Sequence, residues 1–131
     1  MAAAESYPDD LKYHEEHDWA RVDGDEAVLG ITWFAADALG ELVHFEAPEV
    51  GSTVTKDQSY GEVESVKAVS DVIAPLSGEV LEVNEQVVGA PETVNEDPYG
   101  NGWLLRIRLA DAAETDALLD VGAYRELLAS Q

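Results

Sequence analysis

The stretch GEVESVKAVSDVIAPLSGEV, residues 61–80, decides the fold. Its valines at 63, 66, 69 and 72 recur every third residue, as they would on one face of a helix. Valine is a poor helix former, however, and Pro75 and Gly78 would soon end a helix. The alternative is a hairpin with arms at 61–65 and 69–75 and a bend at Val66-Lys67-Ala68, a turn that lacks the usual Gly, Asn or Pro. Pattern alone leaves both interpretations open.

The charge of the chain makes the lysine in this stretch unusual. Among 131 residues there are 28 acidic and only 7 basic side chains, for a net charge of −21. So few basic groups cannot form a phosphate-binding surface, which argues against nucleic acid and against an anionic membrane surface as partners. The excess of acid is typical of a soluble monomer that attracts partners with basic patches.

Cysteine is absent, so disulfides, thiolate nucleophiles and cysteine metal sites are excluded. His14 and His17 have a spacing that would suit a zinc pair, but we favour a solvated start of the first strand and predict no metal site. The first 13 residues show no basic, apolar leader and no apolar run long enough to span a membrane. We therefore expect a cytoplasmic protein with a flexible N-terminus at 1–8.

The first half of the chain predicts a hairpin, a helix and a strand. DWARVDGDEAVLGIT, residues 18–32, reads as two strands around Asp23-Gly24, a pair suited to a type I′ turn. A short helix follows at 33–39, with Thr32 as N-cap and Gly40 as C′ residue. In the next strand, ELVHFEAP at 41–48, alternation places Val43 with Phe45 on one face and Leu42 with a structural His44 on the less buried face.

The second half predicts many short strands and a helical tail. Between residues 51 and 109, Gly, Pro, Asn and Asp break short apolar runs, which is typical of a sandwich or small barrel. In the last strand, WLLRIRLAD, alternation predicts that Leu105, Ile107 and Leu109 face one way and Arg106 and Arg108 the other. Asp111 and Glu114 stand in capping-box relation before the tail. An apolar stripe is expected to pack on the sheet: Leu118, Leu119, Val121, Tyr124, Leu127 and Leu128. We expect one mainly β domain over 1–131.

Four segments together resemble the glycine cleavage system H protein family. ESVKAVSDVIAPLSGEV is similar to its lipoyl attachment segment, and VNEDPYGNGWLLRI to its C-terminal signature. HDWARVDGDEAVLGIT and ALGELVHFEAPEVGSTV resemble its N-terminal half, so the match runs from about Leu11 to the final helix. The resemblance implies a lipoyl/biotinyl-type hybrid barrel-sandwich, with a short helix in the N-terminal half and helices at the C-terminus. It also implies the hairpin, with Lys67 at its tip.

Residue by residue, the resemblance implies that Lys67 carries lipoate as an amide; a merely solvated surface lysine is the alternative. Glu64 and Asp71 flank it as charge markers for lipoate attachment enzymes, although Glu64 serves solubility equally well. In the family a loaded, cationic arm rests in an acidic cleft, which here implies Glu16, Asp18 and Asp71. Two departures bear on that cleft: Asp18 replaces a common glutamate, and Trp33-Phe34 replaces an acid followed by His or Tyr.

The implied function is a shuttle rather than an enzyme. The protein would take an aminomethyl group from a pyridoxal-phosphate glycine decarboxylase to a tetrahydrofolate-dependent aminomethyltransferase. Dihydrolipoamide dehydrogenase, with FAD and NAD, would then reoxidise the arm. No nucleophile–base set or phosphate loop supports catalysis by the chain itself.

Three alternatives remain open. The protein could relay lipoyl groups to 2-oxoacid dehydrogenases, and the sequence does not separate that role from glycine cleavage. It could be a biotin carrier, but such domains place methionines around the lysine, where this chain has Val66 and Ala68. It could also be an unmodified acidic binding module, which would keep its function without Lys67.

Overall fold

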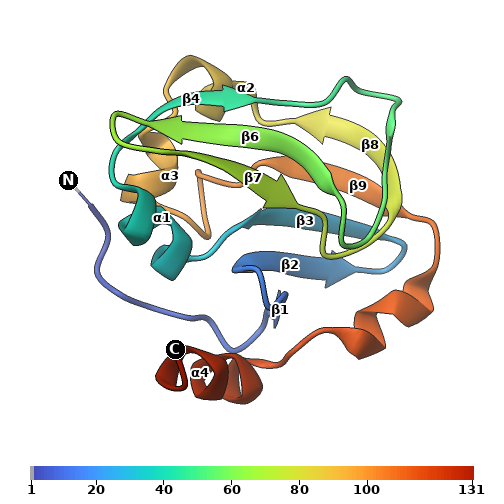
Figure 1. The fold of residues 1–131 in the computed structure, drawn as a ribbon. Helices are drawn as coiled ribbons and strands as arrows, with labels where there is room; N and C mark the ends of the chain where they lie inside the picture. The colour runs from blue at the N-terminus through green and yellow to red at the C-terminus, as the bar shows by residue number, and fades with distance from the viewer. Residues whose placement is uncertain (1) are drawn as a thin grey trace.

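Two antiparallel sheets form the framework of the computed structural model, which describes residues 2–131 (Figure 1). The larger sheet has the order β1 (Lys12–Tyr13), β2 (Asp18–Asp23), β3 (Glu26–Ile31), β9 (Leu105–Leu109), β8 (Gly78–Val83) and β5 (Thr53–Val54). The smaller sheet has the order β4 (Leu42–Glu46), β6 (Ser59–Ser65) and β7 (Val69–Ile73). The prediction of a mainly β, sandwich-like fold is confirmed.

Four α-helices and one 3₁₀ helix connect or flank the strands in the described part of the chain. They are α1 (Trp33–Leu39), α2 (Glu85–Gly89), α3 (Thr93–Glu96), the 3₁₀ helix η1 (Ala112–Ala117) and α4 (Val121–Ala129). Figure 1 shows α1 and α3 at the end of the sandwich towards which the β6–β7 hairpin points, and α4 beneath the larger sheet. Within residues 2–131 no helix is long and apolar enough to cross a bilayer.

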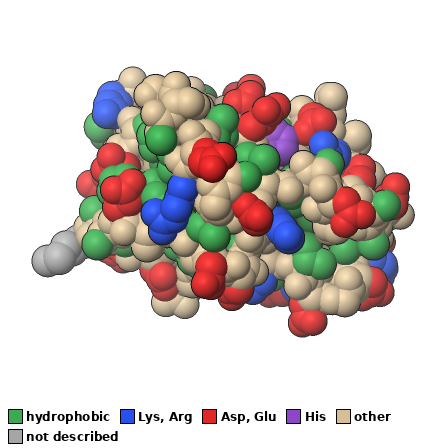
Figure 2. Space-filling model, turned by 90° about the horizontal axis from the view of Figure 1, so that it is seen from below, with side chains coloured by type: hydrophobic (Ala, Val, Ile, Leu, Met, Phe, Trp, Pro, Cys, Tyr) green, Lys and Arg blue, Asp and Glu red, His purple; other side chains and the backbone are tan. Residues whose placement is uncertain are grey.

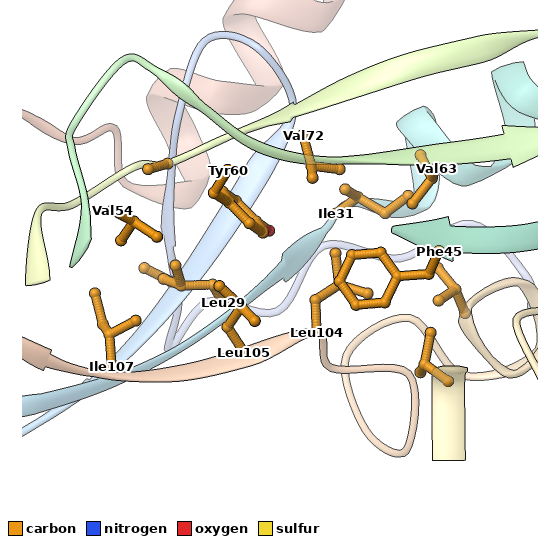
Figure 3. Packing of buried hydrophobic residues seen from close by; sticks show 14 of the residues in the cluster. Leu29, Ile31, Phe45, Val54, Tyr60, Val63, Val72, Leu104, Leu105 and Ile107 are labelled. Carbon is orange, nitrogen blue, oxygen red and sulfur yellow. The ribbon is translucent and has the colours of Figure 1, made fainter. Parts of the chain in front are cut away.

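The main core lies between the two sheets (Figure 3). Leu29 and Ile107 from the larger sheet face Val63 and Val72 from the smaller one, and each is at most 1% exposed. Tyr60 also projects from β6 into this layer, and its hydroxyl end points into the interior. Alternation along each strand supplies these inward residues, as period-2 patterning requires.

A second apolar cluster covers the outer face of the larger sheet. Tyr7, Leu11, Tyr13, Trp19 and Tyr124 are its buried members, so it joins the N-terminal segment and α4 to β1 and β2. The rings of Tyr13 and Tyr124 stack with centroids 4.6 Å apart. Outside this cluster, Figure 2 shows acidic side chains spread over the face of the molecule that is seen from below.

The N-terminal segment, for which the sequence predicts flexibility at 1–8, forms hydrogen bonds with distant parts of the chain. The Ala3 amide donates to the Asn95 carbonyl at 2.9 Å, and the Trp33 indole donates to the Ala3 carbonyl at 2.8 Å. The Tyr99 hydroxyl donates to the Ser6 carbonyl, and the buried Tyr7 ring contacts the Tyr124 ring edge-on, with the centroids 5.6 Å apart. Residues far along the chain hold this segment. The composition of the segment itself does not indicate these contacts. Residue 1 lies outside the described residues.

The first hairpin is confirmed, but the predicted type I′ turn at Asp23-Gly24 is wrong. Asp23 pairs with Glu26, so the two loop residues are Gly24 and Asp25. Type I′ needs a positive φ at both loop residues. Here Gly24 has φ 65° and Asp25 is not among the described residues with positive φ. Glycine therefore stands at the first loop position, as a type II′ turn requires.

The helix at 33–39 is confirmed with both of its predicted caps, since the Thr32 hydroxyl accepts from the Ala35 amide and Gly40 ends the helix with φ 87°. In the next strand the predicted faces are wrong. A bulge between Leu42 and His44 shifts the register, so Leu42 and Phe45 are both buried while Val43 is 49% exposed. His44 is exposed, in agreement with its predicted place on a less buried face.

The last strand and the C-terminal apolar stripe have the buried faces that the sequence predicts. In β9, Leu105 and Ile107 are buried and the two arginines point outward, where Arg106 forms ion pairs with Glu26 and Glu82. The tail residues of the stripe pack against the two cores as predicted. The predicted capping box is only half formed. Asp111 accepts from the Ala113 amide, but the Glu114 carboxylate accepts instead from the amide and hydroxyl of Ser77.

Candidate functional site

Lys67 lies at the tip of the β6–β7 hairpin, so the hairpin interpretation of residues 61–80 is confirmed. Glu64 pairs with Val69, and the Ser65 amide closes the turn by donating to the Ala68 carbonyl at 2.8 Å. Lys67 and Val66 are exposed, with Val66 at 87%. The lysine side chain is therefore available to other molecules.

Ser65 explains how this turn forms without Gly, Asn or Pro. Its side chain is buried in the turn, with the residue only 4% exposed. The hydroxyl oxygen accepts hydrogen bonds from the Lys67 amide at 3.3 Å and the Ala68 amide at 3.1 Å. A serine hydroxyl can replace the backbone acceptor of a turn in this way. Sequence reasoning missed this residue, although a serine two positions before the lysine is the signal.

Replacing Ser65 by alanine is expected to loosen the hairpin tip. The Lys67 and Ala68 amides would lose their acceptor, and a net loss of about 1 kcal/mol corresponds to roughly five-fold faster local opening. Hydrogen exchange of these two amides, followed by NMR, measures it. The matched control is Ser70→Ala, which removes an exposed hydrogen bond from the Ser70 hydroxyl to the Asp71 carbonyl. Equal exchange rates in Ser65→Ala and the wild type would show that the hydroxyl does not hold the turn.

The stem of Lys67 passes over the end of α1. A Cβ atom added at Gly40 would lie 3.5 Å from Lys67 Cε, an ordinary van der Waals distance, so the lysine stem lies next to Gly40. No group among residues 2–131 forms a hydrogen bond or ion pair with Lys67 Nζ. An exposed primary amine without a partner fits the attachment of an acyl group as an amide, because no internal ion pair has to be broken first.

Glu64 and Asp71 both lie on the outward face of the hairpin. Glu64 pairs with His44 on β4, and Asp71 pairs with Glu62. All four side chains are exposed, whereas Val63 and Val72 on the opposite face are buried. The two predicted recognition residues thus present carboxylates to solvent on the same side of the lysine-bearing hairpin.

Asp18 does not lie on a surface. It is 2% exposed at the start of β2, and burial raises the pKa of its carboxyl well above the usual value, an effect partly offset by a hydrogen bond from the Ile73 amide. Within residues 2–131 neither its Oδ1 atom nor the Tyr60 hydroxyl has a hydrogen-bond partner. Burial raises the pKa of Tyr60 as well. The shorter aspartate therefore forms part of the interior, where its neutral form is favoured.

The charge state of Asp18 predicts a dependence of stability on pH. The unfolded chain loses the Asp18 proton near pH 4, while the folded chain keeps it, so stability falls by up to about 1.4 kcal/mol per pH unit until the folded group ionises. Asp18→Asn should remove this contribution. Urea unfolding at pH values from about 4 to 7 measures it, and Asp116→Asn, at an exposed position of η1, is the control. Parallel curves for Asp18→Asn and the wild type would contradict the buried neutral carboxyl.

The two N-terminal histidines both make hydrogen bonds within the fold. His14 is 6% exposed, donates from Nε2 to Asp57 at 2.7 Å, and accepts from the Glu16 amide at Nδ1, so the preferred expectation of a solvated start is wrong here. His17 Nδ1 bonds the Tyr124 hydroxyl at 2.8 Å, and burial lowers the pKa of His17. Residues 2–131 contain no group of three potential ligands arranged for a metal ion.

Glu16 remains exposed in the turn that precedes β2, two positions before buried Asp18. Of the three residues expected to line an acidic cleft, Glu16 and Asp71 therefore present charge to solvent, and Asp18 does not. Phe34, part of one of the two departures from the family pattern, has its ring centroid 4.6 Å from that of His17.

A cavity of about 260 Å³ lies between α1 and α3. Trp33, Ala36, Asp37 and Gly40 face it from α1, a spacing that puts them on one side of that helix. The remaining lining residues are Ala2, Glu41, Glu92, Asn95 and Glu96. The cavity combines apolar lining groups with carboxylates, and Gly40 is common to it and to the contact with Lys67.

Asn95 is a positioning residue that sequence reasoning missed. Its side chain accepts from the Leu42 amide at 2.9 Å and donates to the Gly40 carbonyl at 2.9 Å. These bonds fix the end of α1 and the start of β4 against α3. Asn95 therefore sets the position of Gly40 under the lysine, a role that no local pattern around it indicates.

Comparison with known proteins points to one family. The family described as "Glycine cleavage H-protein" matches residues 11–131. The glycine cleavage system H protein of Symbiobacterium thermophilum is 52% identical over 117 residues, covering 89% of this chain and 91% of that protein. A probable glycine cleavage system H protein of Haloarcula marismortui is 52% identical over 119 residues, covering 91% and 94%. The crystal structure of a glycine cleavage system H protein from Mycobacterium marinum superimposes with a TM-score of 0.86 at 42% identity, covering 94% of this chain and 99% of that one.

Proposed function

The chain belongs to the glycine cleavage H-protein family, and from this premise we propose that Lys67 carries a lipoyl group and that the protein shuttles it between the enzymes of glycine cleavage. The observation that supports this most strongly is the lysine itself, exposed at the tip of an ordered hairpin with no internal partner for its amine among the described residues. A lysine placed there has a long flexible stem that reaches outward from a rigid base.

The lipoyl group would supply the chemistry that the chain lacks. The chain has no cysteine and therefore no dithiol of its own, whereas a lipoyl group held by Lys67 would supply a disulfide that can open, so that one sulfur carries the aminomethyl carbon of glycine and the other becomes a thiol. The protein contributes position and access, and performs no turnover itself. Its proposed partners are glycine decarboxylase, the tetrahydrofolate-dependent aminomethyltransferase, dihydrolipoamide dehydrogenase and the lipoate attachment enzymes. We place this exchange, with the protein as a monomer, in the cytoplasm.

Recognition by the attachment enzymes is proposed to use Glu64 and Asp71. Both carboxylates are exposed on the outward face of the hairpin that carries Lys67. An enzyme surface with matching basic groups would approach the tip from this side, guided by charge complementarity. The exposed Val66 and Val69 beside the lysine would give the same enzyme an apolar contact at the tip.

A docking site for the loaded, cationic arm is proposed to involve Glu16, Asp18 and Asp71 in unequal roles. Glu16 and Asp71 are exposed and would supply the negative charge. Asp18 is buried with its neutral form favoured, so it would contribute a hydrogen bond and not a negative charge. Substituting Glu16 and Asp71 together by their amides should accelerate the release of ammonia from the loaded protein.

Reconstitution tests the proposed function. Lipoylated protein is combined with the three enzymes, glycine, tetrahydrofolate and NAD, and the formation of NADH is followed. We expect NADH formation that depends on glycine and is proportional to the concentration of lipoylated protein, with the unmodified protein as control. Equal rates with modified and unmodified protein would contradict the carrier function and favour an unmodified acidic binding module.

A further inference from the structure

We propose that Asp18, Tyr60 and Ile73 form a proton-dependent clamp that holds the base of the β6–β7 hairpin against the larger sheet. The clamp is closed while the Asp18 carboxyl carries its proton, and it opens when that proton is lost. Asp18 therefore acts as a positioning residue for Lys67, which the same hairpin carries at its tip. This inference goes beyond the proposed function, and it applies to the chain with or without a group on Lys67.

The first argument is the place where Asp18 and Ile73 meet. Asp18 begins β2 in the larger sheet, whereas Ile73 ends β7 in the smaller one. The Asp18 carboxyl accepts a hydrogen bond from the Ile73 amide, so a polar contact joins the two sheets at this point. Ile73 pairs with Ser59 at the start of β6, which places the contact at the base of the hairpin.

The second argument is an irregularity in β6 beside this contact. The register of β6 against β7 shifts between Ser59 and Gly61, at Tyr60. Tyr60 projects from this point into the layer between the sheets, where it is 7% exposed (Figure 3). A bulge interrupts regular pairing and redirects a side chain. Here it places a phenol in the interior, next to the strand end that contacts Asp18.

The third argument is that Asp18 and Tyr60 both have buried polar atoms without partners. Asp18 is 2% exposed, and within residues 2–131 neither its Oδ1 atom nor the Tyr60 hydroxyl has a hydrogen-bond partner. A charge on Asp18 acts on Tyr60, so the two groups lie within electrostatic reach of each other. A neutral carboxyl group is tolerated in such an interior, whereas a carboxylate without a compensating partner costs much more free energy.

The titratable groups that face Asp18 do not compensate a negative charge. Burial raises the pKa of its carboxyl, and the like charge of Glu16, in the turn before β2, raises it further. Tyr60 on β6 and Tyr124 on α4 are neutral phenols that both feel the Asp18 charge. The Ile73 amide offsets these effects only in part. Loss of the proton therefore favours an arrangement in which the carboxylate reaches water.

The hairpin is the element that can move to allow this. β7 is an edge strand of the smaller sheet and pairs on one side only, with β6. Separation of Ile73 from Asp18 therefore breaks no strand pairing beyond that edge. β2, in contrast, pairs on both sides, with β1 and β3. An ionised Asp18 is expected to release the base of the hairpin and leave the larger sheet in place.

Hydrogen exchange of the unmodified protein, followed by NMR between about pH 5 and 8, tests the clamp. Protection factors, which are corrected for the intrinsic pH dependence of exchange, are compared at two places. The Ile73 amide and the Ala74 amide, which donates to the Gln58 carbonyl, report on the base of the hairpin. The Leu104 amide, which donates to the Leu29 carbonyl, reports on the larger sheet. The carbon shift of the Asp18 carboxyl gives its protonation state in the same samples.

We expect the protection of Ile73 and Ala74 to fall by up to about ten-fold per pH unit until the folded carboxyl ionises, because the open state binds one proton fewer. Their protection should stay below that of Leu104, since this opening is smaller than global unfolding. Asp18→Asn keeps the shape of the side chain but cannot ionise, so the pH dependence at Ile73 and Ala74 should disappear. Glu62→Gln, at an exposed position of the same hairpin, is the matched control and should leave it unchanged.

Two results would overturn the clamp. Constant protection of Ile73 and Ala74 across the pH range would mean that the Asp18 proton does not hold the hairpin base. Protection that falls to the same value at Leu104 would mean that only global unfolding releases Asp18. The wild-type pH series decides between these results even if Asp18→Asn folds poorly. Both results leave the proposed function untouched, because the protein tested carries no lipoyl group.

Discussion

Lys67→Arg is expected to abolish lipoylation and to reduce glycine-dependent NADH formation to the background without lipoylated protein. The guanidinium keeps the positive charge but is not an amine that forms the lipoyl amide. Because Lys67 is exposed and has no partner for its amine among the described residues, the free energy of unfolding should change by less than about 0.5 kcal/mol. Intact mass, the coupled assay and urea unfolding measure the three effects on one preparation.

Lys12→Arg is the matched control for this substitution. Lys12 is exposed on the short strand β1, far from the hairpin in sequence, and should remain unmodified while Lys67 is lipoylated. Normal NADH formation by Lys67→Arg would mean that the lysine is not the point of attachment. Unfolding of Lys67→Arg would mean that the hairpin tip has a structural role that the exposed side chain does not show.

Trp19→Ala is expected to destabilise the fold by about 3–5 kcal/mol, the usual cost of removing a large buried aromatic side chain. Trp19 is fully buried in the cluster between β2, the N-terminal segment and α4. Its indole donates to the Pro98 carbonyl at 3.1 Å, and its ring fills the space beside Gly30, where an added Cβ would come within 2.5 Å of it. Denaturant unfolding measures the loss, which is a large part of a typical stability.

Val22→Ala on the same strand is the control, since Val22 is 38% exposed and lies towards the end of β2. Val22→Ala should lower the free energy of unfolding much less than Trp19→Ala does. A loss below about 1 kcal/mol for Trp19→Ala would show that the outer cluster contributes little to folding. In that case α4 and the N-terminal segment would be held mainly by their hydrogen bonds.

The elements with strong local signals could be predicted from the sequence. The helix at 33–39 has a threonine that caps its start and a glycine that ends it, and both act as expected. The alternation in β9 is uninterrupted, so its buried and exposed residues follow directly. The hairpin around Lys67 had an ambiguous pattern, and the resemblance to a family decided it.

The features that could not be predicted depend on contacts between distant parts of the chain. The bulge in β4 arises from pairing with β6, and it moves Leu42 and Phe45 to the same side. Asp18, at the start of β2, is buried, and its carboxyl group accepts a hydrogen bond from the Ile73 amide of β7, a contact that its neighbours in sequence do not indicate. The N-terminal segment is held by Trp33, Asn95 and Tyr99, which lie at least 27 residues downstream of residue 6.

The candidate site also contains both features that the sequence indicates and features that depend on distant contacts. Lys67, Glu64 and Asp71 occupy the exposed hairpin positions that the resemblance implied. Ser65 forms the turn below the lysine, Gly40 lies next to the lysine stem, and Asn95 makes two hydrogen bonds that fix the Gly40 segment. The serine two positions before the lysine is a local signal for the turn, whereas nothing near Asn95 in the sequence indicates its partners.

The most direct test of the central claim is the mass of the peptide covering residues 61–80, isolated from protein purified from its native host. We predict an increase by the mass of one lipoyl group, with fragment ions that place it on Lys67. An unmodified Lys67 in cells supplied with lipoate would contradict the account.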